Sequence, residues 1–69
     1  MRIKDLQGIL IGNVTLKKWN EKAEGFTVIY SSTNFQVFYL SDELKEMEVM
    51  TIHADEEDQE QNFIIVEVE

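Results

Sequence analysis

The stretch EVMTIHADEEDQEQNFIIVEVE, residues 48–69, decides the fold that we predict for this chain. It holds two mainly apolar runs, Val49–Ala54 and Phe63–Val68, on either side of a polar segment. Short runs rich in valine and isoleucine between polar segments are typical of β-strands. Residues 63–66 are apolar at every position, which indicates a central strand or one covered by a helix. We therefore predict two strands joined by a loop.

The loop between these strands is mostly acidic, because it carries Asp55, Glu56, Glu57, Asp58 and Glu60. Such a run is typical of a solvated surface loop. It would also suit a phosphate-mimicking surface that docks on a basic groove, because opposite charges steer association. A third interpretation is a calcium loop, but that motif requires glycine at its sixth position, where this chain has Glu60. We take the five acids as candidate partner-binding residues.

Charge is divided unevenly along the chain. Residues 1–40 contain five basic and three acidic residues, whereas residues 41–69 contain one lysine and eleven acids. The formal net charge is −8. Because phosphate contacts need lysine and arginine, we expect no direct DNA binding through the acidic part. A basic protein surface is the partner that this distribution favours.

The first eleven residues predict a short helix. Ile3, Leu6 and Leu10 have helical spacing. Gly8 costs about 1 kcal/mol relative to alanine, so this helix needs packing to hold it. The alternative is that the first strand begins near residue 9, where two β-branched residues stand.

Three strands follow, at Val14–Trp19, Phe26–Tyr30 and Phe35–Leu40. The polar segment 20–25 ends in glycine and predicts a hairpin loop. Ser31–Asn34 has the composition of a turn. Three successive strands with short connections predict an antiparallel meander.

A second short helix is predicted at Ser41–Met47, with Ser41 as its N-cap. The fold class is therefore α+β, a single domain with a short N-terminal helix and a five-stranded antiparallel sheet, or a small SH3-like barrel, whose second helix lies between strands three and four. The predicted core is Leu6, Leu10, Val14, Leu16, Val28, Val37, Leu44, Val49, Ile52, Ile64 and Val66.

Residue types that carry catalysis or hold cofactors are few. With 69 residues, no cysteine and one histidine, the chain offers no thiolate chemistry and little basis for a zinc site. His53 has no second histidine or nucleophile beside it in the sequence, so a packed or surface role is expected. We predict a non-enzymatic protein without cofactor or metal. Of the aromatic residues, most are expected in the core, and an exposed remainder would mark an interface.

Three segments resemble small acidic proteins encoded in phages and prophages of Gram-positive bacteria. They are the opening MRIKDL (1–6), the spacing Glu48-Val-x-x-Ile-x-Ala54, and the ending IIVEVE (64–69). The opening and the charge also resemble acidic anti-CRISPR proteins that occupy the nucleic-acid groove of their target. The first resemblance implies a phage-accessory origin, and the second implies inhibition of a host defence protein.

We thus expect a small acidic interaction protein whose partner has a basic surface. The alternative is a structural or assembly protein that self-associates as a homodimer through an apolar sheet face. The N-terminal segment lacks the long apolar core of a signal peptide, and no apolar run approaches the ~18–20 residues of a membrane span. The expected location is the cytoplasm of a bacterial host.

Overall fold

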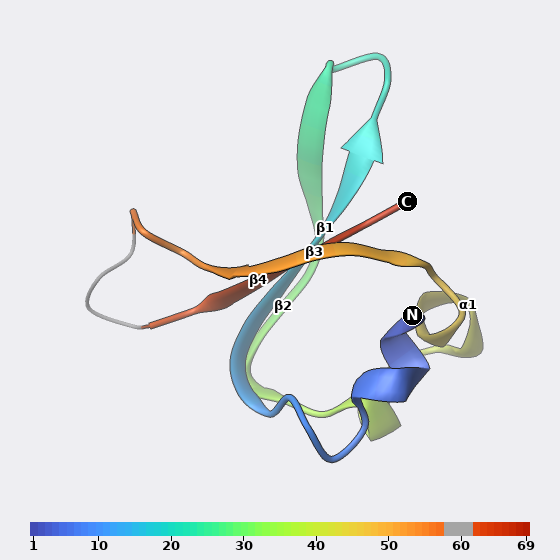
Figure 1. Ribbon diagram of the computed structural model, residues 1–69, viewed down its shortest axis with the longest axis vertical. Helices are drawn as coiled ribbons and strands as arrows, with labels where there is room; N and C mark the ends of the chain where they lie inside the picture. Colours follow the sequence, from blue (N-terminus) through green and yellow to red (C-terminus); the bar gives the residue numbers. More distant parts are fainter. Residues whose placement is uncertain (58–61) are drawn as a thin grey trace.

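The computed structural model describes residues 1–57 and 62–69 (Figure 1). Two β-hairpins are connected by helical turns. In chain order the elements are η1 (Ile3–Leu6), β1 (Gly12–Asn20), β2 (Gly25–Phe35), η2 (Val37–Tyr39), α1 (Asp42–Lys45), β3 (Val49–Ala54) and β4 (Ile64–Val68).

The sheet formed by these strands has the order β2-β1-β4-β3. Each hairpin is antiparallel, but β1 and β4 pair in parallel at the centre, from Val14 beside Ile64 to Lys18 beside Val68. The prediction of a five-stranded antiparallel sheet or SH3-like barrel is therefore wrong. The described residues form a mostly β domain instead of the predicted α+β fold: they make one mixed four-stranded sheet, and the helical elements are short turns.

The segment Phe35–Leu40, predicted as the third strand, is mostly helical turn. Only Phe35 belongs to a strand, the end of β2, and Val37–Tyr39 forms the 3₁₀ turn η2. Val37 and Leu40 are both buried, and their spacing of three suits one face of a 3₁₀ turn. Phe38 and Tyr39 then point outward, with Phe38 70% exposed.

Ser31–Asn34, predicted as a turn, lies inside β2 instead. Ser31 and Ser32 pair with Thr15 and Val14 of β1. The hydroxyls of Thr15 and Ser31 are hydrogen-bonded at 3.0 Å, so polar residues stabilise this part of the ladder. Their turn-like composition reflects a half-exposed strand, not a reversal of the chain.

The N-terminal helix is a single 3₁₀ turn, shorter than predicted. It buries Ile3 and Leu6, and Asp5 caps it by accepting a hydrogen bond from the Arg2 backbone N–H at 2.9 Å. Gly8 and Gly12 have positive φ angles of 78° and 98°. Glycine adopts this backbone region readily, so the chain can leave the turn and enter β1.

The structure confirms two other predictions, the N-cap at Ser41 and the strand β3. The Leu44 backbone N–H donates to Ser41 Oγ at 3.3 Å, although α1 ends at Lys45, before the predicted Met47. β3 has the predicted bounds, and β4 begins one residue later than predicted.

One face of the sheet is covered by the helical turns, and the core lies between them. Of the predicted core residues, Leu6, Val14, Leu16, Val37 and Val66 are buried, whereas Leu10, Leu44, Val49 and Ile64 are partly buried. Buried residues that the prediction missed are Ile3, Phe35, Leu40, Ile65 and Val68.

Val28 and Ile52 were predicted in the core and are exposed. A register shift in the β1–β2 ladder between Leu16 and Lys17 places Val28 opposite Lys17, so Val28 turns away from the core and is 58% exposed. Ile52 lies on β3, the outer strand beside β4, where little covers it.

We use the term open face for the sheet surface that the helical turns do not cover. Side chains alternate along a strand, so the neighbours of the core residues Leu16 and Val66 lie there. Cross-strand pairing then places on it Thr15 with Ile65 and His53, and Lys17 with Glu67 and Thr51. Figure 1 shows the helical turns gathered on one side, with the tip of the β1–β2 hairpin projecting past the other strands.

The difference between Leu16 and Val28 gives a test of this register. Leu16 is fully buried, so Leu16→Ala is expected to lower the free energy of unfolding by about 2–5 kcal/mol. Val28→Thr keeps a β-branched side chain at an exposed site and should change it by less than about 0.5 kcal/mol. Urea unfolding of the two variants measures both values. Equal destabilisation would contradict the register shift.

Candidate functional site

The acidic segment predicted to bind a partner follows β3 directly. The Asp55 backbone N–H donates to the Phe63 carbonyl oxygen at 2.9 Å, which closes the β3–β4 hairpin at this point. Asp55 Oδ1 accepts a hydrogen bond from the Glu57 backbone N–H at 3.1 Å, a local turn typical of aspartate. Glu56 and Glu57 are exposed, and Asp55 is half-buried. The structure thus brings three of the five candidate acids together.

Asp58 and Glu60, the other two candidate residues, lie outside the described residues. The calcium-loop interpretation depends on them as well. Within residues 1–57 and 62–69, no group of three or more acidic or histidine side chains is arranged to hold a metal ion.

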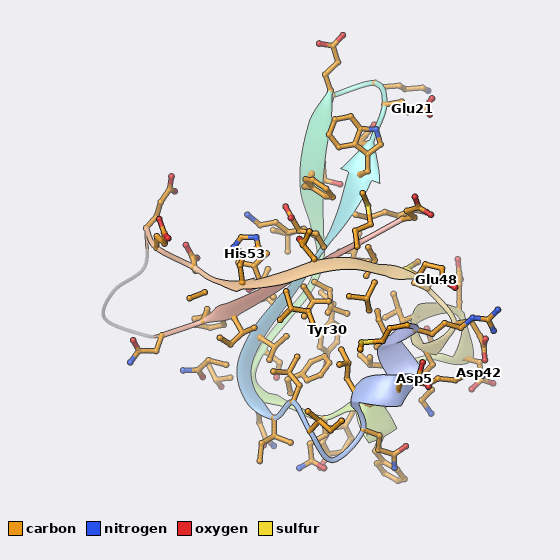
Figure 2. The ribbon with its side chains drawn as sticks, in the orientation of Figure 1. Asp5, Glu21, Tyr30, Asp42, Glu48 and His53 are labelled. Carbon is orange, nitrogen blue, oxygen red and sulfur yellow. The ribbon has the colours of Figure 1, made fainter. Side chains whose placement is uncertain are left out.

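A second acidic cluster, formed by Glu46 and Glu48, lies beside the helical turns and is paired with cations of the chain. Lys4 Nζ donates to Glu46 Oε1 at 3.1 Å, and Arg2 also binds Glu46. Arg2 Nε lies 3.6 Å from Glu48 Oε1. In Figure 2, Glu48 lies on the same side of the molecule as Asp5 and Asp42, away from His53.

These contacts shift two pKa values. The hydrogen bonds from Lys4 and then Arg2 lower the pKa of the Glu46 carboxyl, because they favour its ionised form. The hydrogen bond to Glu46, with its opposite charge, raises the pKa of the Arg2 guanidinium. The basic residues of the N-terminal turn are therefore engaged within the chain.

The acids of the β3–β4 hairpin differ from Glu46 and Glu48 in their ion pairing. No ion pair joins Asp55, Glu56 or Glu57 to a cation in the part of the chain that the structure describes. Lys17 lies nearby, since it lines a hollow of about 290 Å³ together with His53, Ala54, Ile65 and the three acids. Lys17 forms no described ion pair with these acids, and Glu56 and Glu57 stay exposed to solvent.

His53, expected from the sequence to be packed or on the surface, is exposed on the open face. Its Nε2 lies 3.4 Å from Glu67 Oε1, and the Thr51 hydroxyl also donates to Glu67. Figure 2 shows His53 on β3, toward the end that carries the acidic loop. The alternation of Thr51 and His53 opposite a charged residue on the next strand is the sequence signal that could have indicated this polar group.

The aromatic residues are less buried than predicted. Phe35 is buried, and Phe26 and Tyr30 are half-buried. Trp19, Phe38 and Tyr39 are exposed. Most of the aromatic residues were expected in the core, and for Trp19, Phe38 and Tyr39 this expectation is wrong. Trp19 and Phe26 line a second hollow of the molecule.

Comparison of the chain with protein-family models, with curated proteins and with solved structures finds no match to any of them. The phage and anti-CRISPR resemblances therefore stay predictions. Among the described residues there is also no helix with the length and apolar character needed to cross a membrane.

The Glu46 contacts predict a pH dependence. The pKa of Glu46 is lower in the folded chain than in the unfolded chain, so ionised Glu46 stabilises the fold at neutral pH. This contribution is complete above the unfolded pKa and is lost as the pH falls through the folded pKa. Glu46→Gln should therefore lower the melting temperature slightly at pH 7 and leave it nearly unchanged at about pH 2.

Thermal unfolding followed by circular dichroism across this pH range measures the effect. Glu21→Gln, on an exposed acid outside the helical turns and without a described ion pair, is the matched control. A difference between Glu46→Gln and the native chain that is as large at acid pH as at neutral pH would contradict the assignment.

Proposed function

We propose that this chain is a non-enzymatic interaction protein that docks the acidic end of its β3–β4 hairpin on a basic protein surface. The observation that supports this most is the contrast between its two acidic clusters. Glu46 and Glu48 are paired with cations of the chain, whereas Asp55, Glu56 and Glu57 have no such pair among the described residues, and Glu56 and Glu57 are exposed. An unpaired anionic cluster is available to a cationic partner.

Physical chemistry favours this use of the cluster. Glu56 and Glu57 are exposed, so water hydrates their carboxylates until a partner arrives, and opposite charge speeds the encounter. The net charge of −8 acts in the same direction over longer range. It also disfavours direct contact with DNA phosphates, so we propose a protein partner instead.

The proposal includes the origin and setting that the sequence resemblances imply. We propose a phage or prophage accessory protein that acts in the cytoplasm of a bacterial host. A groove that binds nucleic-acid phosphates is a basic surface of the required kind, so the partner class includes host defence proteins. In that case the hairpin acids would stand where phosphates bind, and the chain would act as an inhibitor.

Self-association is the second candidate, and exposed apolar side chains favour it. Met50 and Ile52 are 49% and 44% exposed on β3, an outer strand of the sheet. An outer strand presents unpaired backbone groups and can add a strand of another chain. Under this alternative the chain would be a structural or assembly protein that works as a homodimer.

A charge-neutralised variant tests the main proposal. Asp55→Asn, Glu56→Gln and Glu57→Gln are combined in one chain, and the matched control combines Glu21→Gln, Glu24→Gln and Glu43→Gln at other exposed acids. An exposed ion pair contributes about 0.2–1 kcal/mol, so losing three should weaken partner binding by roughly tenfold. The control should bind nearly as well as the native chain.

The measurement is a pull-down from bacterial lysate at low and high salt, followed by titration of the captured protein. We expect binding that weakens steeply as salt rises, because the ion atmosphere screens exposed charges. Affinity that is equal in the hairpin variant and the control contradicts the proposal. Salt-insensitive binding, with sedimentation as a dimer at micromolar concentration, supports self-association instead.

A further inference from the structure

A second hollow lies at the opposite end of the open face from the acidic loop. It has a volume of about 330 Å³ and is lined by Trp19, Phe26, Met50 and Glu69. These residues come from β1, β2, β3 and the position after β4, so the site exists only when the whole sheet has formed. Its volume is at the lower end of the ~300–1,000 Å³ range of ligand pockets, which suits one side chain better than a large ligand.

Two aromatic rings form a corner of this pocket. Trp19 and Phe26 are paired directly across the β1–β2 ladder. Their ring centroids are 5.3 Å apart, and the ring planes meet at 74°. Trp19 remains 42% exposed, so part of its side chain is free to contact another molecule. Aromatic faces of this kind attract cations through their negative π-density.

An acidic residue, Glu69, also lines this mostly apolar pocket. The Glu69 backbone N–H donates to the Glu48 carbonyl oxygen at 3.1 Å, which fixes the position of the residue beside β3. The Glu69 side chain forms no ion pair with a cation of residues 1–57 or 62–68. An acidic residue therefore lies beside the aromatic corner, with no ion pair to a cation of the described residues.

Met50 supplies the remaining wall. The β3–β4 register shifts between Val49 and Thr51, and Met50 is the residue inside this shift. Such an irregularity re-aims a side chain that regular pairing would place elsewhere. The methionine thioether is soft and adapts to the shape of a group inserted beside it.

We infer that this pocket receives an arginine side chain of the partner protein. The planar guanidinium would lie against the Trp19 and Phe26 rings and donate hydrogen bonds to the Glu69 carboxylate. Arginine suits both contacts, because it is weakly hydrated, stacks on aromatic faces and binds carboxylates through two N–H groups. An apolar side chain would gain nothing from the charge of Glu69, and an anion would be repelled by it.

This inference rests on the proposed function, since it names a contact made by the same basic partner. The pocket and the acidic loop are separated by the length of β3. Asp55 follows Met50 by five positions, which corresponds to roughly 17 Å along an extended strand. A partner surface with basic groups at both ends of such a span would contact the loop acids and place one arginine in the pocket.

The experiment uses Nα-acetyl-arginine amide as the probe and the indole signal of Trp19 as the reporter, because Trp19 is the one tryptophan of the chain. Titration is followed by NMR, with the neutral isostere Nα-acetyl-citrulline amide and the apolar Nα-acetyl-norleucine amide as matched probes. We expect the arginine probe to shift the Trp19 signal with at least threefold tighter binding than either of the others.

Variants separate this site from the acidic loop. Glu69→Gln should weaken the arginine probe at least threefold and remove its advantage over citrulline, whereas Glu21→Gln should not. The triple loop variant Asp55→Asn, Glu56→Gln and Glu57→Gln should bind the probe as the native chain does. Loss of partner binding in that loop variant tests the proposed function alone, and loss of probe binding in Glu69→Gln tests the pocket alone.

Three results would overturn the inference. The first is equal binding of the arginine and citrulline probes, which would show that charge is not recognised. The second is tighter binding of the norleucine probe, which would show an apolar pocket. The third is unchanged probe affinity in Glu69→Gln, with the fold intact by amide spectra, which would show that the carboxylate is not part of the site.

Discussion

The parallel pairing of β1 with β4 is the constraint on which the rest of the structure depends. Each hairpin could form from local contacts, but this central pairing joins the two into one sheet and buries Leu16 beside Val66. Parallel strands need a long connection, and here β2, the helical turns and β3 provide it. Because the turns pack on one face only, the other face stays open, and four strands contribute side chains to it.

Charge is arranged around this framework in two ways. Near the helical turns, Arg2 and Lys4 form ion pairs with Glu46, so this acid stabilises the fold. At the far end of β3 the acids Glu56 and Glu57 are exposed and lack described ion pairs. The open face therefore has an anionic end and an aromatic end with a carboxylate, and both ends suit a cationic partner. The proposed function and the arginine pocket follow from this arrangement.

Local features of the fold could be predicted from the sequence, and the pairing of distant strands could not. The bounds of β3 and the Ser41 cap follow from alternation and capping chemistry, which act over a few residues. Alternation shows which residues share a face, but it does not identify the neighbouring strand, so the parallel centre of the sheet was missed. The register shift that exposes Val28 is likewise set by the β1–β2 ladder. The acids of the candidate site can be recognised in the sequence as a run of charge. The aromatic pocket cannot be recognised there, because each of its walls comes from a different part of the chain.

The most direct test of this account is the backbone contact pattern between β1 and β4, measured by nuclear Overhauser effects on the isotope-labelled chain. The structure predicts contacts in parallel register, from Val14 with Ile64 to Lys18 with Val68. Contacts between these strands in the reverse order would contradict it. So would contacts that pair Phe35–Leu40 with β2 as a third strand of a meander.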